Sequence, residues 1–268
     1  MTNLTQDNTQ IIIDEYDENY CLGLEHAYGD GMMSDGGHEA TDRLFTEDNL
    51  DGKTILEIGF GLGGSALHIA STHNIKELHG LEINPWMVKK VSDRFPESVK
   101  DKIKLHLYHP QEKLNFDNES FDLVFSKGVL THLKDKQNLF NELYRILKPG
   151  GVVIINDCLS PNKGKWCDNI QRMTELDNLT MYAETETGYD RFLSEAGFTD
   201  VKFRDENPDS YKANMNVVEN LERKFAKNNT NQIFNKKYYE DSIEGYKCIA
   251  NDIKDNELLM RWIRCVKK

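Results

Sequence analysis

The sequence predicts an α/β fold, with helices on both faces of a doubly wound, Rossmann-like parallel sheet. Short apolar runs alternate with amphipathic segments of helical length between residues 54 and 206, and this alternation is typical of parallel strands joined by helical crossovers. A glycine-rich turn follows the first of these runs. The chain has 268 residues, 38% of them hydrophobic and 29% charged, which is enough to bury the core of one large domain.

The first half of the pattern begins with a helix ahead of the glycines. Its apolar side chains, Ala40, Leu44 and Phe45, fall on one side. A later helix begins at Pro85, because proline is favoured in the first turn. The predicted elements of this half are a helix over 37–47, a strand over 54–59, a helix over about 63–71, a strand over 77–83 and a helix over 85–95.

The second half continues the alternation and then becomes helical. The helix before the last predicted strand ends at Gly197, and residues 160–182 are mixed helical and polar. The predicted elements are strands over 102–108, 121–126, 151–157 and 199–206, helices over 134–147 and 187–198, and helical tail segments over 214–225 and 253–266.

These elements divide the chain into three parts of a single domain. Residues 1–50 form an N-terminal helical cap, residues 51–206 form the Rossmann-like core, and residues 207–268 form a C-terminal helical extension that acts as a lid. The stretch 227–237 is polar enough for a surface loop. In such sheets the ligand lies beyond the carboxyl ends of the strands, near the point where strand order reverses.

Charge and cysteine content disfavour several classes of protein. The formal net charge is −12, whereas proteins that grip a nucleic-acid backbone carry a basic footprint. No apolar run is long enough to span a membrane, and the N-terminal residues do not form a signal peptide. The five cysteines are scattered, without zinc-type spacing. We therefore expect a cytoplasmic monomer or homodimer with a small-molecule substrate and no nucleic acid, membrane or metal partner.

The glycine-rich turn indicates a ligand site at the end of the first strand. In "ILEIGFGLGGSAL" the spacing from Gly59 and Gly61 onward is G-x-G-x-G-G, rather than the G-x-G-x-x-G of a dinucleotide site. Glu57 would crowd a pyrophosphate but suits a positively charged, amino-acid-bearing ligand. Glu82, at the tip of the second strand, can accept both hydroxyls of a ribose. Because NAD enzymes also place an acid there, Glu82 alone does not distinguish the two ligands.

The ordered set of motifs resembles the class I S-adenosylmethionine (SAM)-dependent methyltransferases. The set comprises E-I-G-x-G-x-G-G, the acidic second-strand tip, "SFDLVFS" and "LKPGG", and the resemblance covers roughly residues 33–205. In addition, "MMSDGGHEATDRL" and "VLTHL" look like segments of the phosphoethanolamine, or phosphobase, N-methyltransferases. The resemblance implies SAM as the cofactor and S-adenosyl-L-homocysteine as its product.

The resemblance also implies which residues bind the cofactor. The acid that usually contacts the adenine amine is replaced within "YHPQ", so Gln111 or a backbone carbonyl would substitute. Lys127 would lie near the carboxylate of the cofactor. The residues expected to bind the cofactor are Met33, Ser34, Glu57, Gly59, Gly61, Glu82, Ile83, Gln111 and Lys127.

A catalytic pair and an acceptor site follow from the same resemblance. Tyr16 and His132 would form a dyad that closes over the substrate, and a histidine titrates close enough to neutrality to take a proton from an ammonium or a hydroxyl. Packing within an amphipathic helix is the other interpretation of Tyr16. Gly128 replaces an acid that faces the substrate in the family, and Asn251 lies near the position of a phosphate-binding lysine. The residues expected to bind the acceptor are Gly128, Tyr28, Tyr182 and Lys247.

The sequence therefore predicts a SAM-dependent methyltransferase that methylates the nitrogen of a small amine such as phosphoethanolamine. O- or C-methylation of another small metabolite is an alternative. A non-catalytic, SAM-binding regulatory protein is an alternative from a different class. A nicotinamide-dependent oxidoreductase is disfavoured by Glu57 and by the glycine spacing.

Overall fold

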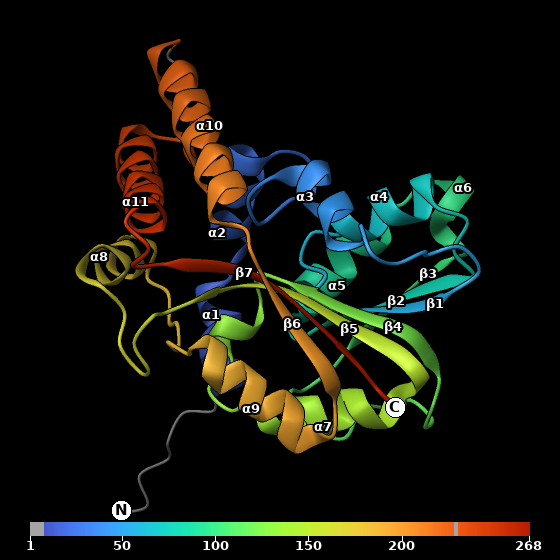
Figure 1. The fold of residues 1–268 in the computed structure, drawn as a ribbon. Coiled ribbons are helices and arrows are strands. Elements are labelled where there is room, and N and C mark those ends of the chain that lie inside the picture. Colours follow the sequence, from blue (N-terminus) through green and yellow to red (C-terminus); the bar gives the residue numbers. More distant parts are fainter. Residues whose placement is uncertain (1–7, 228–229) are drawn as a thin grey trace, which may run out of the picture.

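The computed structural model describes residues 8–227 and 230–268 of the chain (Figure 1). Within these residues the strands are β1 Thr54–Ile58, β2 Glu77–Glu82, β3 Ile103–Leu107, β4 Phe121–Lys127, β5 Leu147–Leu159, β6 Thr199–Asp205 and β7 Leu259–Val266. They form a seven-stranded sheet in the order β3-β2-β1-β4-β5-β7-β6.

Strand order reverses at the centre of the sheet, where β1 lies beside β4. From there β2 and β3 extend in one direction and β5 in the other, and all of these pairings are parallel. The carboxyl ends of β1, β2 and β4 therefore meet at one edge, which is where open sheets of this type bind ligands. The predicted doubly wound fold is confirmed.

Helices cover both faces of the sheet, as the alternation of side chains along its strands requires. The covering helices are α3 Gly37–Leu44, α4 Gly64–Thr72, α5 Pro85–Ser92, α6 Glu97–Lys100, α7 Gln137–Ile146 and α9 Glu186–Ala196. Ile55 and Leu123 pack on one face, in a cluster with side chains of α3 and α4. Their neighbours Leu56 and Val124 pack on the opposite face, in a cluster with side chains of α7 and α9.

Residues 259–266 form a strand, whereas the sequence predicts a helix over 253–266. This strand, β7, pairs antiparallel with both β5 and β6. The preceding helix, α11 (Lys236–Lys254), ends before Asn256, whose left-handed φ of 57° helps to turn the chain back. The apolar run is compatible with the period of a helix and with that of a strand. Burial of Trp262 between two neighbouring strands favours the strand. The sheet is therefore mixed rather than fully parallel, and the C-terminal extension is not wholly helical.

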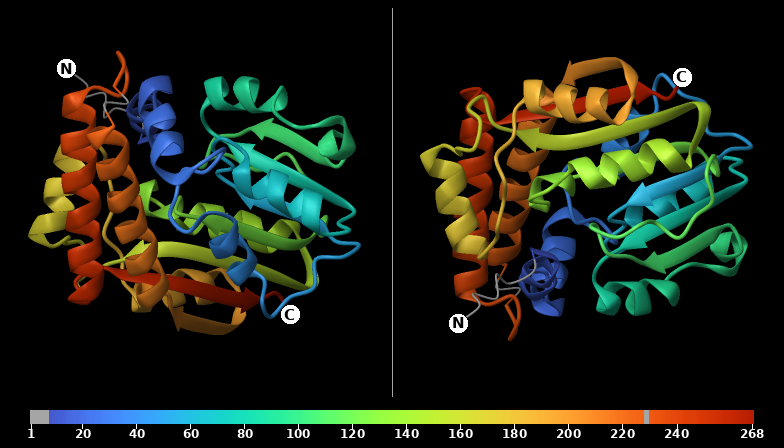
Figure 2. Two further views of the ribbon diagram at one scale, coloured as in Figure 1. Left: turned by 90° about the horizontal axis from the view of Figure 1, so that it is seen from above. Right: turned by 90° about the horizontal axis from the view of Figure 1, so that it is seen from below.

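A group of helices lies beside the sheet at the carboxyl end of β5 (Figure 2). It consists of α1 Asn8–Glu15, α2 Glu18–Tyr28, α8 Asp168–Asp177, α10 Asn207–Ala226 and α11. In this group α10 packs on α11 and α2, and α11 packs on α8. The division into 1–50, 51–206 and 207–268 stays a prediction, and parts of the predicted cap (1–7) and surface loop (228–229) lie outside the described residues. None of the helices described is both long and apolar enough to cross a bilayer.

Candidate active site

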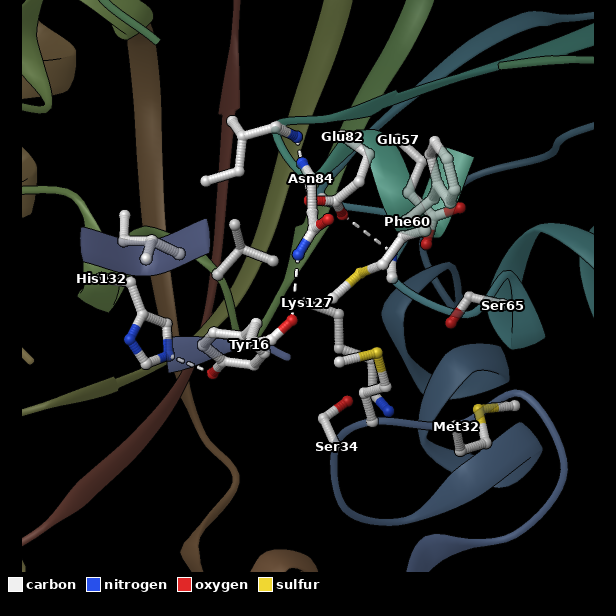
Figure 3. A pocket seen from close by; sticks show the side chains of 18 of the residues that line it. Tyr16, Met32, Ser34, Glu57, Phe60, Ser65, Glu82, Asn84, Lys127 and His132 are labelled. Atoms are coloured by element: carbon white, nitrogen blue, oxygen red, sulfur yellow. Dashed lines mark hydrogen bonds between the residues drawn. The ribbon is translucent and has the colours of Figure 1, made fainter. Parts of the chain in front are cut away.

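A cavity opens at the carboxyl ends of β1, β2 and β4 (Figure 3). Measured to its open mouth it encloses about 860 Å³. All the residues predicted to bind the cofactor, apart from Gln111, line this cavity. We name it the cofactor cavity; its lining includes Tyr16, Met33, Ser34, Glu57, Gly59, Gly61, Glu82, Ile83, Asn84, Lys127, Gly128 and His132.

Gly59 and Gly61 bring bare backbone to the cavity wall. Their φ angles are +71° and +55°, a region that side-chain-bearing residues rarely adopt. A Cβ on Gly59 would lie 2.5 Å from a methyl group of Val129, and a Cβ on Gly61 would lie 2.7 Å from the sulfur of Met33. Both positions therefore require glycine, and the backbone between β1 and α4 can approach a ligand closely.

Glu57 places a buried carboxyl group with an unpaired oxygen at this wall. The residue is 3% exposed, and its Oε2 has no hydrogen-bond partner among the residues described. Burial raises the pKa of Glu57 to about 8; the positive charge of Lys127 opposes this shift and the charge of Glu82 adds to it. Because an unpaired buried polar group is costly, a ligand group that is cationic or donates a hydrogen bond would satisfy this oxygen.

Glu82 ends β2 and is held in place by three backbone amides. The N–H of Gly61 donates to Oε2 at 3.1 Å, and the N–H groups of Ile83 and Asn84 donate to Oε1 at 2.9 and 3.1 Å. Burial raises the pKa of Glu82, and these hydrogen bonds oppose the shift. A carboxylate has about four acceptor sites, so Glu82 is oriented by the backbone and can still accept from ligand hydroxyls.

Asn84 is a residue of the site that the sequence analysis does not single out. Its side-chain oxygen accepts from the N–H of Trp86 at 3.1 Å and caps α5, while its Nδ2 donates to the carbonyl of Tyr16 at 2.9 Å (Figure 3). Asn84 therefore joins the N-terminal segment to the end of β2. An asparagine directly before a proline is a recognisable helix N-cap signal, but its contact with Tyr16 has no local signature.

Tyr16 and His132 lie within hydrogen-bond distance at the cavity wall (Figure 3). The tyrosine hydroxyl is 2.9 Å from Nε2 of His132, and Nδ1 is 3.0 Å from the carbonyl oxygen of Thr180. A carbonyl only accepts, so Nδ1 carries the proton and Nε2 accepts from the tyrosine hydroxyl. Burial lowers the pKa of His132, an effect that the Thr180 hydrogen bond opposes. The imidazole is therefore neutral at pH 7, with its basic nitrogen next to Tyr16.

A second cavity adjoins the first, and Tyr16 and His132 line both. Measured to its open mouth it encloses about 830 Å³. We name it the acceptor chamber. Gly128 and Tyr28, two of the residues predicted to bind the acceptor, line it. Its polar lining also includes Tyr20, Asp35, Asp177, Asn214 and Tyr246.

Gln111 and Tyr182 line neither cavity, and the binding roles predicted for them stay predictions. The Gln111 side chain is exposed and donates to the carbonyl of Asp135 at 3.4 Å. The Tyr182 hydroxyl instead accepts from the side chain of Asn8 at 3.3 Å. Both residues lie in loops. The sequence does not specify the direction of these loops, so it does not predict how far the two side chains lie from the site.

Lys247 is the third predicted residue that lies outside both cavities. It forms an ion pair with Glu222 at 2.7 Å on the exposed surfaces of α11 and α10. Tyr246, one residue earlier on α11, lines the acceptor chamber. Successive residues on a helix point in directions about 100° apart, so the helix that directs Tyr246 inward directs Lys247 outward.

The cofactor cavity fits the cofactor that the motifs imply. The unpaired oxygen of Glu57 suits the ammonium group of an amino acid, and Glu82 suits ribose hydroxyls. Gly59 and Gly61 line the same cavity with backbone alone. Lys127 lines the same wall and donates to the backbone carbonyl of Asp35 at 2.9 Å, which holds the loop that carries Met33 and Ser34.

Comparison with known proteins agrees with this arrangement. A methyltransferase-domain family model matches residues 56–155. A phosphoethanolamine N-methyltransferase of Arabidopsis thaliana is 28% identical over 242 residues, which are 87% of this chain and 46% of that protein. The phosphoethanolamine N-methyltransferase of Plasmodium falciparum is 27% identical over 269 residues, which are 97% of this chain and 95% of that protein. The chain thus spans about half the length of the plant relative.

A solved structure has the same fold. Phosphoethanolamine N-methyltransferase 2 of Haemonchus contortus, in complex with phosphomonomethylethanolamine and S-adenosylhomocysteine, superposes with a TM-score of 0.83 at 22% identity, covering 98% of this chain and 60% of that one. Residues 56–155 thus match a methyltransferase domain, and the fold and the cofactor cavity fit a class I SAM-dependent methyltransferase. In sequence the chain is similar to phosphoethanolamine N-methyltransferases.

Proposed function

We propose that the protein transfers the methyl group of SAM to the nitrogen of a small amine. The observation that carries the proposal is the Tyr16–His132 pair, which lines both the cofactor cavity and the acceptor chamber. When bound, SAM supplies an electrophilic methyl group on its sulfonium. The acceptor nitrogen forms a bond to that methyl carbon as the carbon–sulfur bond breaks, and the nitrogen loses one proton.

The residues of this chain provide the orientation and the proton acceptor for such a reaction. Glu57 and Glu82 would hold the two ends of the cofactor, while Gly59 and Gly61 leave room for it. His132 keeps an unprotonated Nε2 next to the Tyr16 hydroxyl. The pair can take the amine proton at Nε2 itself, or at the tyrosine oxygen as the tyrosine proton passes to Nε2.

The protonation state of His132 favours nitrogen over oxygen as the acceptor atom. Burial lowers the pKa of His132, so its imidazole is a weak base. A weak base removes a proton more readily from an ammonium than from an alcohol, whose pKa is much higher. The names of the relatives support the same choice, because they are N-methyltransferases.

The proposal is tested by SAM binding followed by methyl transfer. Calorimetry measures SAM affinity, and methyl-labelled SAM is then incubated with a panel of amines, phosphoethanolamine first because the relatives carry its name. We expect SAM to bind and the label to enter an amine. His132→Ala is expected to lower this transfer by about 10²–10⁴-fold with little change in SAM affinity. His73→Ala, at the end of α4 and outside both cavities, is the matched control.

Each failure points to a different alternative. An absence of SAM binding would refute the proposal as a whole. SAM binding without transfer to any amine would favour a non-catalytic SAM-binding protein, and label in a hydroxyl or carbon position would favour O- or C-methylation.

We also propose that the protein works in the cytoplasm on a small molecule rather than on nucleic acid, as a monomer or a homodimer. The five free cysteines are compatible with a reducing compartment. The net charge of −12 supports the absence of a nucleic-acid substrate. Light scattering on the purified protein separates the two oligomeric states, and fluorescence microscopy of a tagged chain tests its location.

A further inference from the structure

The acceptor chamber is acidic. Its charged lining side chains are Asp35 and Asp177, and no lysine or arginine of the described residues lines it. Lys127 lines the cofactor cavity instead, where its ammonium group donates to a backbone carbonyl. The imidazole of His132 is neutral, as its environment requires. Lys127 thus interacts with Asp35 from the side of the cofactor cavity. Among the described residues that line the chamber itself, two carboxyl groups are present and no lysine or arginine.

Asp177 is ionised at the pH at which methyl transfer to amines is usually followed. It lies at the end of α8 and accepts a hydrogen bond from the Tyr20 hydroxyl at 3.3 Å. Burial raises the pKa of Asp177 to about 6, and the hydrogen bond from Tyr20 opposes the shift. At about pH 8 the group is a carboxylate.

Asn214 adds an unused hydrogen-bond acceptor. The side chain is 2% exposed, and its Nδ2 donates to the carbonyl of Ser210 at 2.8 Å and to the carboxylate of Asp35 at 3.4 Å. These two bonds identify the nitrogen, so the other amide atom is oxygen. That Oδ1 is buried without a partner among residues 8–227 and 230–268. A ligand group that donates a hydrogen bond would satisfy it.

Aromatic rings complete a setting that suits a cation. Tyr16 packs edge-on to Tyr20 with ring centroids 5.4 Å apart, and Tyr28 packs edge-on to Tyr246 at 5.3 Å. All four line the chamber. The faces of aromatic rings attract ammonium groups, and clusters of such rings are used to recognise methylated amines.

We infer that the acceptor of this chain is an amine that carries no phosphate group. The inference rests on the proposed function and names the class of its substrate. A phosphate dianion in the chamber would face Asp35 and Asp177, and no lysine or arginine of the described residues lines the chamber to pair with it. Like charges brought together at a binding site weaken binding. An uncharged body attached to the amine can lie against the tyrosine rings and donate to Asn214 Oδ1.

Matched pairs of acceptors test the inference with the wild-type protein. Ethanolamine is compared with phosphoethanolamine, and aminohexanol with its phosphate monoester, because the chamber is large enough for the longer body. Each is incubated with saturating methyl-labelled SAM at about pH 8, and kcat/KM is measured. We expect the hydroxyl compound of each pair to exceed its phosphate ester by about tenfold or more.

The outcomes separate this inference from the function on which it rests. Faster methylation of phosphoethanolamine than of ethanolamine would overturn the inference and leave amine methylation intact. SAM binding without transfer to any of the compounds would overturn the proposed function, and the inference with it.

A variant comparison locates the effect in the chamber. Asp177→Asn removes one of the two negative charges and is expected to narrow the preference within each pair by several-fold, chiefly through KM. Its SAM affinity should stay unchanged, which also shows that the variant is folded. Glu175→Gln is the matched control, because this carboxylate lies on the same helix with 70% of its side chain exposed. Equal narrowing in both variants would contradict a specific effect of Asp177.

Discussion

Burial shifts the ionisable groups of the site in a way that matches their proposed chemistry. It lowers the pKa of His132 and raises that of Glu57 to about 8. The histidine is therefore a neutral acceptor of protons, with Nδ1 committed to Thr180 and Nε2 directed to Tyr16. Glu57 holds its proton until a cationic group arrives to replace it. Glu57 is thus suited to bind a cationic group, and His132 is suited to accept a proton.

Replacement of Tyr16 by phenylalanine separates positioning from proton transfer. Tyr16→Phe removes the hydroxyl that donates to Nε2 of His132 but keeps the ring. We expect kcat to fall by about 2- to 13-fold, the equivalent of one hydrogen bond of about 0.5–1.5 kcal/mol, while the affinity for SAM changes little. Steady-state kinetics and calorimetry check this. A loss as large as that of His132→Ala would show that the tyrosine oxygen itself carries the proton.

The pH dependence of stability tests the ionisation of Glu57. Between about pH 4.5 and 8 the unfolded chain has released the proton of this carboxyl, whereas the folded chain without ligand keeps it. The folded state then binds more protons, so the free energy of unfolding falls as pH rises, by at most about 1.4 kcal/mol per pH unit. Glu57→Gln has no proton to lose, so its profile in urea unfolding should be flatter and should exceed that of the wild type above pH 8.

A surface carboxylate provides the control for that series. Glu39→Gln changes the same chemical group where 82% of the side chain is exposed, and its profile should run parallel to that of the wild type. If the stability–pH profile of Glu57→Gln ran parallel to that of the wild type, Glu57 would ionise as an ordinary surface glutamate does.

The sequence reveals the residues of the cofactor cavity more fully than those of the acceptor chamber. Glu57 and Glu82 stand at strand tips next to a glycine motif, so local order predicts where they meet. Asp177 and Asn214 come from α8 and α10, and no spacing relates them to each other. Their meeting depends on how helices pack at the end of the sheet, which is a long-range property.

At the scale of elements, β7 determines how the two halves of the chain are joined. It inserts between β5 and β6, so residues 259–266 lie inside the sheet. The strands and helices predicted between 54 and 206 are found close to their expected positions because each has a clear period of its own, whereas the short helix α6 has no predicted counterpart. The run Leu258–Ile263 has no such period, and its conformation is set by the vacant position between two strands. The residues of α8 also lack a clear period, so the sequence does not predict that helix.

Trp262 is the residue of β7 on which this joining is best tested. It is 1% exposed, its indole N–H donates to the carbonyl of Leu44 at 2.9 Å, and the guanidinium of Arg204 lies 4.2 Å from its ring. Trp262→Ala should therefore lower the free energy of unfolding by about 3–5 kcal/mol, measured by urea denaturation. Lys268→Ala, with 71% of its side chain exposed, should change it by less than about 0.5 kcal/mol. A small effect of Trp262→Ala would contradict a central position of β7.

At the scale of the whole molecule, the N-terminal segment, residues 8–36, forms one wall of the cofactor cavity at the carboxyl ends of the strands. It is attached by polar contacts from Glu15 to Thr180, from Asn84 to the carbonyl of Tyr16, and from the N–H of Gly64 to the carbonyl of Gly31. An isolated helix as short as α1 is not stable in water, so its order depends on these contacts. The cofactor cavity lies directly against the same segment, through Tyr16 and Met33.

Ligand binding should therefore slow the local opening of this segment more than that of any distant element. If the segment must open for the product S-adenosyl-L-homocysteine to leave, ligand at 100 times its Kd raises the free energy of opening by about 2.7 kcal/mol, which is about 100-fold slower exchange of its amides. Hydrogen exchange read by mass spectrometry should show this protection in residues 8–36, with little change in α9, none of whose residues lines the cofactor cavity. The Glu57→Gln variant should lose much of this protection at the same ligand concentration, because we expect its affinity for S-adenosyl-L-homocysteine to be lower. Equal protection of α9 would instead mean that the ligand acts on global unfolding, and that the cap does not open separately from the core.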